Sequence, residues 1–385
     1  MKEPKHSSKA TGAKKVKTPK QRRYSTAVRV VTSIGSSVLA IFGVLCIVAS
    51  VFIISMFSRV TFHEDEVPYD PNADVELEGD EDEDLGGEVV DLDQFQDNNA
   101  LSSIPVRGNQ DGVRNYLLLG IDGKGYSGRA DTTMILSIND NTKTIKLVSL
   151  QRDTFVTIPG RDKDGDGADD VDKLAHAYAY GRHTLHMKMI EENFRLDIDE
   201  FIGVNFSTLP KVIDAMGGLD IRLTAKEMTQ IPDHGCNVAI PVPGQDCDGK
   251  EGFVALKGEP GVHHLNGFPA MQYARIRKLD SDFKRTARQR EVVELMIAKA
   301  KKMSYSQLVS VMNRALECVS TNMTADEFLG FAANATRYIG YEVQTDLSVP
   351  LNADEYKGVI LNKRSGLMLT DPKALVEKLH KYLYE

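Results

Sequence analysis

The sequence predicts an α/β fold: a three-layer α/β/α domain with a central mixed sheet over residues 111–385, preceded by one transmembrane helix and a disordered acidic linker. Three observations lead to this prediction. Residues 30–57 carry no charge, residues 58–110 are strongly acidic, and later in the chain apolar runs of strand length alternate with longer amphipathic stretches. Strands that alternate with helices are typical of layered α/β domains.

The amino-terminal segments have the charge distribution of a membrane anchor. Residues 1–29 carry ten Lys or Arg and one Glu, and the uncharged run 30–57 has an apolar core at 38–57. About 20 apolar residues are enough for a helix to cross a bilayer. A cleaved signal peptide is the alternative, but its apolar part would be about 7 to 15 residues long. Since Lys and Arg stay on the cytoplasmic side, we expect a single-pass protein of the cell membrane, with a disordered cytoplasmic tail and everything after Ser58 extracellular.

Residues 58–110 form the predicted linker. Between Val60 and Ala100 there are sixteen Asp or Glu and no Lys or Arg. A segment with so much charge of one sign buries too little apolar surface to fold. We therefore expect a self-repelling, disordered tether; a calcium or partner site in the acidic run is the alternative.

The folded part is expected to begin near Arg114. Strands are predicted from the apolar runs NYLLLGID, TTMILSIN, TIKLVSL, FIGVNF and LDIRL, and a long helix from AHAYAYGRHTLHMKMIEENF. Further helix boundaries are predicted at Ser207, at Gly217 and Gly218, at the capping-box pair Thr324 and Glu327, and at Asp371.

Polar side chains of similar composition follow several predicted strands. The segments GIDGKGYSGRADTT, SLQRDT and YARIRKLDSDFKRTARQ each place Arg beside Asp, and the ligands of α/β folds gather where strands end. Tyr273–Arg277 is predicted as a strand with Arg275 and Arg277 on one face, followed after Ser281 by a helix that carries its own arginines.

A phosphate with its metal ion is the ligand that these groupings indicate. Separate surface ion pairs are the simplest alternative, yet each contributes only about 0 to 1 kcal/mol, which does not explain three groupings at strand ends. Arg binds phosphate oxygens through two parallel hydrogen bonds, and carboxylates hold Mg²⁺ together with substrate phosphates. The sequence therefore predicts a pyrophosphate site with Mg²⁺.

Taken together, these motifs resemble the LytR-CpsA-Psr family of bacterial cell walls. The resemblance runs from about Arg114 to at least Tyr338 and includes GID with RADTT, SLQRDT followed by VTIPG, DKLAHAYAYG, and the spacing Y-x-R-x-R-x-x-D-x-D-x-x-R-x-x-R-Q. Two positions depart from the family pattern: Gln151 stands where Pro is usual, and Ala130 stands where Ser is common. Neither departure removes a charged group, so both concern local loop geometry more than activity.

The resemblance implies a phosphotransferase that moves a glycopolymer from a polyprenyl pyrophosphate carrier onto a peptidoglycan hydroxyl, with Mg²⁺ as cofactor. Positioning and electrostatic stabilisation dominate such chemistry. By the same resemblance, the expected catalytic residues are Arg152, Asp131, Asp153, Arg275 and Arg277, the expected substrate-binding residues are Arg129, Arg285, Arg288 and Gln289, and the expected metal ligands are Asp122 and Asp131. Asp153 and Asp131 both remain candidates for the base.

Two other functions stay open from the sequence. One is a non-catalytic binder of lipid-linked wall polymer, and the other is a hydrolase that releases polyprenyl phosphate to water. Nucleic acid is not an expected partner, although clustered Arg is also typical of its binding, because the predicted topology puts the Arg cluster outside the cell. The basic tail, residues 1–29, is expected to bind anionic membrane lipid.

A berth for the leaving lipid is expected between helices and sheet, although an ordinary core uses the same side chains. Its candidate residues are Met187, Ile190, Phe194, Val204, Phe206, Leu209, Val212 and Ile213.

The segment DKDGDGADD resembles the start of a calcium-binding EF-hand loop. Asp162, Asp164 and Asp166 occupy positions 1, 3 and 5, and Gly167 occupies position 6, whereas position 12, normally Glu, is Lys173. A structural Ca²⁺ loop and a plain acidic turn are both consistent with this pattern.

The cysteines give a weaker indication. Cys236 and Cys247 flank a hairpin-like insert, where a local disulfide suits an oxidising compartment. Cys318 is expected to be a buried free thiol.

Overall fold

The computed structural model describes residues 59–62, 69–72, 87–92, 95, 99–110, 112–122, 128–231, 255–276 and 279–385. The predicted basic tail, the apolar run 30–57 and the pair Cys236 and Cys247 lie outside these residues. Contacts divide the chain into two units, Met1–Ser58 and Arg59–Glu385. Within the described part of the chain, no helix is both long and apolar enough to span a bilayer.

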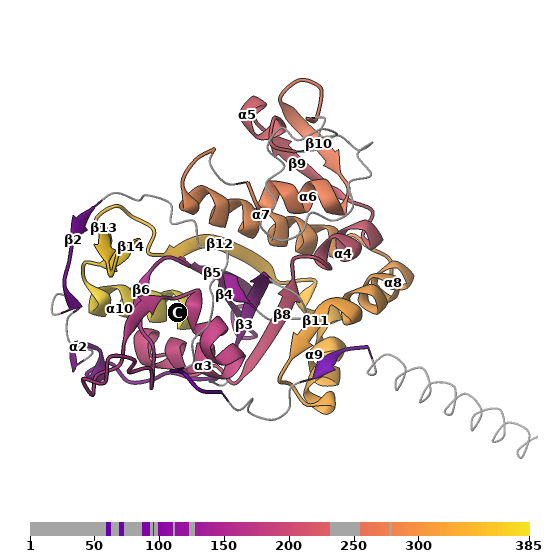
Figure 1. Ribbon diagram of the computed structural model, residues 1–385. Helices are drawn as coiled ribbons and strands as arrows, with labels where there is room; N and C mark the ends of the chain where they lie inside the picture. Colours follow the sequence, from indigo (N-terminus) through magenta and orange to yellow (C-terminus); the bar gives the residue numbers. More distant parts are fainter. Residues whose placement is uncertain are drawn as a thin grey trace, which may run out of the picture. The chain divides into compact units, whose positions relative to one another are not determined.

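The second unit is built on a seven-stranded sheet (Figure 1). Its order is β1-β11-β8-β3-β4-β5-β12, with parallel and antiparallel neighbours, so the predicted central mixed sheet is confirmed. The bounds are β1 (Thr61–Phe62), β11 (Val319–Thr321), β8 (Glu200–Asn205), β3 (Val113–Asp122), β4 (Arg129–Asn139), β5 (Thr144–Leu150) and β12 (Glu342–Val349).

Helices pack on both faces of this sheet because successive side chains of a strand point to opposite faces. In β3, Leu117, Leu119 and Ile121 join the main core with α3 (His176–Phe194) and α10 (Pro372–Tyr384). Tyr116 points the other way and joins a second cluster with Phe328 and Phe331 of α9 (Ala325–Tyr338).

A smaller layer packs against the main sheet and has its own core. It contains α4 (Leu209–Ala215), β9 (Leu219–Leu223), α5 (Ala225–Met228), β10 (Gly261–Leu265), α6 (Gly267–Ala274) and α7 (Asp282–Ala300). Figure 1 shows β9, β10, α5 and α6 on the far side of α7 from β12. The long helix α7 therefore connects this layer to the main sheet.

The predicted strand Tyr273–Arg277 is wrong. Its first residues form the end of α6, and Arg275 follows as the cap of that helix. Ala270, Met271, Tyr273 and Ala274 are all buried, which is a helical spacing. The run from Gly267 is too short for its period to be clear from the sequence, and helix and strand are ambiguous in such runs. The helix predicted after Ser281 is confirmed as α7.

Other predicted boundaries agree with the structure. The capping box of Thr324 and Glu327 opens α9, and the Asp371 side chain accepts a hydrogen bond from the first turn of α10. The cap of α4 is Thr208, one residue after the predicted Ser207. Cys318 is a buried free thiol, as predicted.

The remaining elements lie around this framework, and several belong to the segment predicted as a disordered linker. Here β2 (Glu88–Val89) pairs with β13, β1 pairs with β11, and α2 (Asn99–Ser102) is helical. The structure therefore differs from the predicted disorder at these residues, because strands far along the chain supply backbone partners. The other bounds are β6 (Phe155–Thr157), β7 (Val171–Lys173), α8 (Tyr305–Ala315), η3 (Leu316–Cys318), β13 (Tyr356–Leu361) and β14 (Arg364–Leu369).

Stability at acid pH is predicted to depend on His186 in α3. Its ring is fully buried and shares a hydrogen bond with Thr133 at 3.1 Å, and burial lowers its pKa to about 3. Between about pH 6.5 and pH 3, His186 is protonated in the unfolded chain but stays neutral in the folded chain. The free energy of unfolding therefore falls as pH falls, by up to about 1.4 kcal/mol per pH unit. Urea unfolding of His186→Gln should show a shallower pH dependence in this window.

Thr133→Val is the matched control for that experiment. It removes the hydroxyl partner but keeps the buried imidazole, so it should lower stability at pH 7 without changing the acid slope. An unchanged slope in His186→Gln would contradict the prediction.

Candidate functional site

Four chain segments bring charged side chains to one end of the sheet. Strand β3 ends at Asp122, the adjacent β4 begins at Arg129, and Arg152 lies two residues after the end of β5. Helix α7 begins at Asp282. Because β3 and β5 both run antiparallel to β4, their carboxyl ends and the start of β4 lie together.

A β-bulge aims Asp131 into this site. Gly120 pairs with Thr132 and Ile121 pairs with Ala130, which leaves Asp131 as the extra residue of β4. A bulged residue departs from strict alternation, and bulges are frequent beside active sites because they re-aim a side chain. Asp131 is buried here and accepts from Arg152.

Arg152 is the centre of the site. Its Nη1 donates to Asp131 Oδ1 at 2.9 Å, its Nε donates to Asp153 Oδ2 at 3.2 Å, and the same Nε lies 3.5 Å from Asp282 Oδ1. Only 6% of the Arg152 side chain is exposed. One guanidinium thus holds three carboxylates, which come from β4, from the turn after β5 and from α7.

Two residues of this network were not predicted from the sequence. Asp282, the first residue of α7, bridges Arg152 and Arg285. Lys173 of β7 places its Nζ 3.5 Å from Asp153 Oδ1 and is almost fully buried. The sequence signal for Lys173 was its position in the motif DKLAHAYAYG. Most residues of this motif are buried in the structure.

The backbone of Lys173 is held by a second buried carboxylate, because its N–H donates to Asp172 Oδ1 at 2.8 Å. The preceding Asp172 accepts from His176 at 3.0 Å, from Tyr180 at 2.6 Å and from Arg364 at 2.8 and 3.0 Å. Burial opposes ionisation of Asp172, but the bonds from His176 and Tyr180 and the charge of Arg364 outweigh it and lower its pKa. The network fixes β7, which presents Lys173 to the site.

Helix α7 contributes residues with two different roles. Arg285 is buried beside Asp282 on the side of the site. Arg288 instead donates twice to Asp280, at 2.8 and 2.9 Å, and once to the carbonyl of Ile276, so it braces the loop before the helix. Gln289 is buried next to it. The expected substrate-binding role of Arg288 stays a prediction.

Arg275 lies at the open side of the site. Its Nη2 is 3.5 Å from Asp122 Oδ2, its guanidinium lies 5.9 Å from the centroid of the Phe206 ring, and 30% of the side chain is exposed. Phe206 in turn lies so close to Gly120 that a Cβ there would come within 2.8 Å of the ring. Arg277, the other predicted catalytic arginine of this motif, lies outside the described residues.

The buried groups of opposite charge alternate in space. Among the described residues, Arg129, Arg152, Lys173 and Arg285 lie close to Asp131, Asp153 and Asp282. Burial alone would raise the pKa of Asp153, but Arg152, Lys173 and Arg285 outweigh it and hold this pKa below its ordinary value. At Asp282 burial prevails over Arg285 and Arg152, and its pKa is raised.

Gln151, where the family usually has Pro, links the site to its supports. Its side-chain Nε2 donates to Ser348 Oγ of β12 at 2.7 Å, and its Oε1 accepts from Thr286 Oγ1 of α7 at 3.1 Å. Its backbone N–H also donates to the carbonyl of Val349, a bond that Pro could not make. Gln151 therefore ties the Arg152 turn to the helix that carries Asp282.

The predicted metal ligands lie on neighbouring strands. Asp122 ends β3 opposite Arg129, and Asp131 follows two residues later on β4. Mg²⁺ is commonly held by one or two carboxylates, with waters and substrate phosphates completing its shell. Both residues offer the carboxylate oxygens that Mg²⁺ prefers, and magnesium binding stays a prediction.

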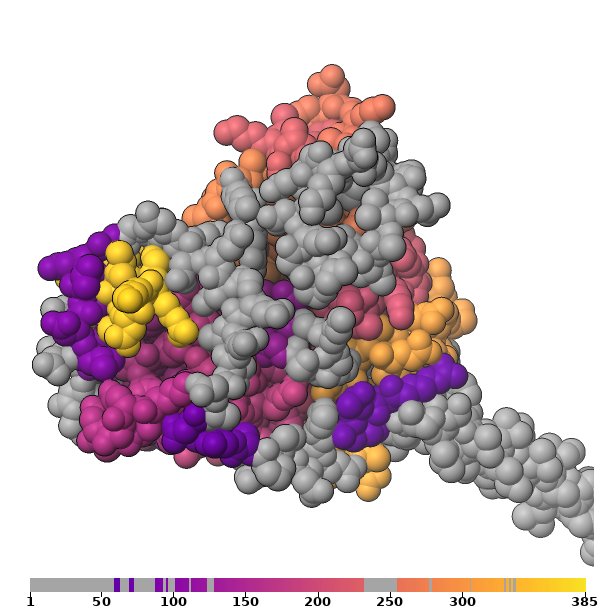
Figure 2. Space-filling model, in the orientation of Figure 1, coloured from indigo at the N-terminus to yellow at the C-terminus, as the bar shows by residue number. Residues whose placement is uncertain are grey.

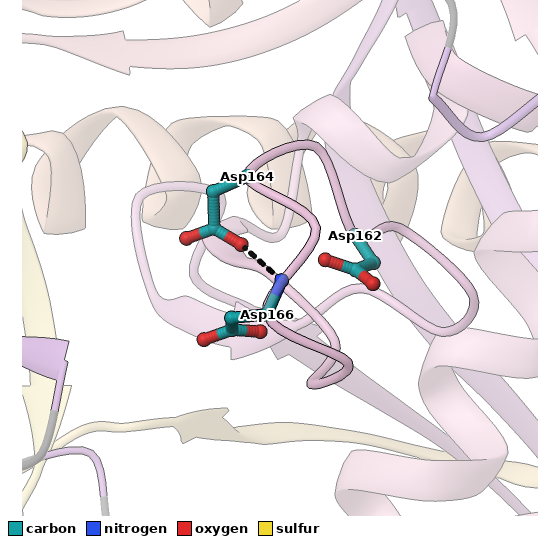
Figure 3. A group of neighbouring side chains, drawn as sticks. All are labelled: Asp162, Asp164 and Asp166. Atoms are coloured by element: carbon teal, nitrogen blue, oxygen red, sulfur yellow. Dashed lines mark hydrogen bonds between the residues drawn. The ribbon is translucent and has the colours of Figure 1, made fainter.

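The predicted calcium residues also come together (Figure 3). Among the described residues, Asp162, Asp164 and Asp166 form a group with carboxylate oxygens within 4.8 Å of one another. Their side chains also accept backbone N–H groups of the same loop, including Asp166 N to Asp164 Oδ1 at 3.2 Å. Position 12 offers no ligand, because Lys173 points to Asp153. Calcium binding stays a prediction.

The predicted lipid berth is not one surface. Ile190 and Phe194 belong to the main core on the α3 face, Ile213 belongs to the core of the smaller layer, and Val212 belongs to a third cluster with Cys318. A cavity of about 930 Å³ lies elsewhere, between β6, the end of α3 and the start of α10, and of the proposed berth residues only Phe194 lines it.

The fold and the site define an α/β domain whose strand ends carry a buried arginine and aspartate network suited to phosphate. The model of the LytR_cpsA_psr family matches residues 84–370 of the sequence. The protein therefore belongs to the LytR-CpsA-Psr family, as the motifs indicated.

Known relatives carry a consistent description. The chain is 30% identical over 276 residues to the polyisoprenyl-teichoic acid–peptidoglycan teichoic acid transferase TagU of Bacillus licheniformis, covering 69% of this chain and 78% of that protein. It is 31% identical over 213 residues to TagT of Bacillus subtilis, covering 53% of this chain and 59% of that protein.

Solved structures share the fold. The crystal structure of TagT from B. subtilis has a TM-score of 0.53 at 25% identity and covers 72% of this chain and 93% of that chain. YwtF (TagT) with bound octaprenyl pyrophosphate lipid has a TM-score of 0.51 at 23% identity, covering 72% of this chain and 92% of that chain.

Gln151→Leu is predicted to slow catalysis through the position of α7. The variant keeps the volume but loses both side-chain hydrogen bonds, which leaves buried hydroxyls at Thr286 and Ser348 and costs about 1 to 3 kcal/mol of stability. Thr286→Val should lower turnover by a similar factor. The turnover of the double variant Gln151→Leu with Thr286→Val should be little lower than that of either single variant, because both substitutions remove the same hydrogen bond. Losses in turnover that multiply would contradict the proposed link.

Calcium is predicted to stabilise the folded chain through the Asp162 loop. At concentrations about tenfold above the dissociation constant the gain is on the order of 1 kcal/mol, and extracellular sites of this kind bind at about 10⁻⁴ to 10⁻³ M. Thermal unfolding of the wild type should shift upward with Ca²⁺, whereas Asp164→Asn with Asp166→Asn should show no shift. A wild type whose unfolding temperature does not change with Ca²⁺ would contradict the prediction.

Proposed function

We propose that the protein is a membrane-anchored, extracellular phosphotransferase that moves a glycopolymer from a polyprenyl pyrophosphate carrier onto a peptidoglycan hydroxyl. The observation that carries the proposal is the buried network around Arg152 at the strand ends, with Arg275 partly exposed beside Asp122. The relatives named as teichoic acid transferases, and the octaprenyl pyrophosphate bound by YwtF (TagT), support the same chemistry.

The described arginines divide the work between binding and organisation. Arg152 donates hydrogen bonds to Asp131 and Asp153. Its main role is therefore to position these carboxylates, and it also contributes positive charge at longer range. Arg275, with its exposed guanidinium, is the group that reaches a phosphate. Mg²⁺ held by Asp122 and Asp131 would neutralise phosphate charge. Preorganised charge of this kind stabilises the transition state without reorganisation.

In the transfer step the acceptor hydroxyl oxygen forms a bond to the phosphorus next to the glycan. The bond from that phosphorus to the bridging oxygen breaks, and polyprenyl phosphate leaves with the electron pair. The hydroxyl proton goes to a carboxylate. Asp153 and Asp131 both stay candidates for this base, since Arg152 binds both carboxylates.

The prenyl chain is proposed to lie on the sheet face that carries Asp122. Leu118 and Gly120 precede Asp122 on this face by alternation, and their partners across the ladder are Ile202 and Val204 of β8. Leu118, Ile202 and Val204 are only half buried, in contrast to the fully buried residues of β3 that face α3. An apolar chain on this face would place its pyrophosphate at Asp122 and Arg275.

Reconstitution with defined substrates tests the proposed function. The full chain in vesicles is given a polyprenyl pyrophosphate-linked saccharide, peptidoglycan fragments and Mg²⁺, and both products are measured. Saccharide on peptidoglycan with equimolar polyprenyl phosphate is expected, as is loss of both after chelation with EDTA and recovery with Mg²⁺. Binding without turnover would indicate the non-catalytic alternative, and polyprenyl phosphate without attached saccharide would indicate the hydrolase.

Arg275→Ala is predicted to lower transfer by about 10² to 10³ while the chain stays folded. The side chain is 30% exposed, so its removal leaves no buried charge without compensation. Arg337→Ala is the matched control, since Arg337 pairs with Asp140 in the turn at the other end of the sheet and is 53% exposed. The measurement is the initial rate of saccharide transfer together with a thermal unfolding curve. Full activity in Arg275→Ala would refute its role.

A further inference from the structure

We infer that strand β1 fixes the active-site end of the sheet against the membrane surface. The inference rests on the proposed function and on the predicted span that ends at Phe57. It concerns the first residues after that span, which the sequence had assigned to a flexible spacer. In the structure these residues already belong to the sheet.

Residues 59–62 are packed as part of the folded unit. Thr61 and Phe62 pair with Ser320 and Thr321 of β11 in parallel. The Phe62 ring meets Phe328 of α9 edge-on at 6.1 Å, and Val60 is buried. Figures 1 and 2 show β1 lying against the orange elements β11 and α9.

The ladder register shows at which end the chain enters the sheet. Thr61 is level with Ser320, Ser320 with Gly203, and Gly203 with Leu119. β1 runs antiparallel to β3, because β11 is antiparallel to β8 and β8 is parallel to β3. The residues before Thr61 therefore lie nearer the level of Asp122, where β3 ends in the active site.

Two lengths limit the distance from bilayer to active site. From Phe57 to Val60 the chain spans at most about 10 Å. From β1 to β3 there are three strand spacings in the sheet, or about 14 Å. A pyrophosphate at the headgroup level of the same leaflet thus lies within reach of Asp122 and Arg275. A long spacer between the span and the domain is not needed.

The surface charge at this end suits a membrane that carries anionic lipid. Arg59 and Arg314 are exposed, and both form ion pairs with Glu317. Lys211 is exposed at the start of α4. The start of this helix is next to Glu317, because the Thr208 carbonyl accepts a hydrogen bond from Cys318. These three described basic groups lie near Glu317, and α4 also carries the exposed Asp214. Each Lys or Arg near an anionic surface contributes about 1 kcal/mol of attraction.

The orientation is tested by fluorescence quenching, without any need for activity. A fluorophore is attached through Ser207→Cys, two residues beyond β8 at the active-site end, or through Lys143→Cys, in the exposed turn between β4 and β5 at the other end. Both are made in the full chain with the native cysteines replaced by Ser. The two positions are about 30 Å apart along the sheet. The chains are reconstituted in vesicles whose lipid headgroups carry a nitroxide quencher.

We expect the Ser207→Cys probe to be quenched several-fold more strongly than the Lys143→Cys probe. Insertion of twenty Gly and Ser residues between Ser58 and Arg59, with an end-to-end distance of about 25 Å, should remove this difference. The same insertion after Lys363, in the β13 to β14 turn, should keep it. Equal quenching at both probes in the uninserted chain, or a chain that does not associate with vesicles, would overturn the inference.

Activity separates failure of the inference from failure of the proposed function. With a short-chain prenyl pyrophosphate saccharide in detergent, the chain inserted after Ser58 should transfer as fast as wild type, since its catalytic network is unchanged. With the long-chain carrier in vesicles, transfer by this variant should fall. Equal transfer from vesicles by both proteins would count against the orientation, whereas no transfer by wild type from either substrate would count against the function.

Discussion

The buried ion network around Arg152 is the constraint on which the rest of the structure depends. Each charge removed from water costs several kcal/mol unless it is paired with good geometry, so the carboxylates of Asp131, Asp153 and Asp282 have to meet one guanidinium. They come from β4, from the turn after β5 and from α7, and the three elements can converge only if the strand register, the bulge of β4 and the start of α7 are all correct. The arrangement of these charged side chains therefore requires that all three elements fold correctly.

The same network determines how the site treats charge. Pairing holds the pKa of Asp153 down, whereas burial raises that of Asp282, although the two carboxylates share Arg152. The same cations therefore favour the ionised form of one carboxylate more than that of its neighbour. Arg275 differs from the buried cations because it keeps contact with solvent. Under the proposed function, a phosphate would meet the partly exposed Arg275 first and the charge of the buried cations behind it.

Sequence periodicity predicted the parts of this arrangement that are local. The strands ending at Asp122 and Leu150 and the helix after Ser281 follow from apolar spacing, and the strand-end arginines follow from motif composition. Periodicity did not predict what depends on pairing across the chain. The bulge at Asp131 exists only relative to Gly120 and Ile121 of β3, and Lys173 reaches Asp153 because Asp172 is clamped by distant groups. Tyr273 was assigned to a strand because its short apolar run fits both periods.

The ordering of Arg59–Phe62 also depends on pairing with a distant part of the chain, the strand β11. This pairing determines how stable that edge of the sheet is. β1 has two residues and β11 has three, so this edge of the sheet contains few backbone hydrogen bonds. Short edge strands also offer little template for pairing with other chains. Their stability depends instead on packing, mainly of Phe62 on α9 and of the buried Val60. Regions with few buried contacts open at lower cost than the central strands. The edge that joins the domain to its predicted anchor therefore depends on the packing of Val60 and Phe62 more than on strand pairing.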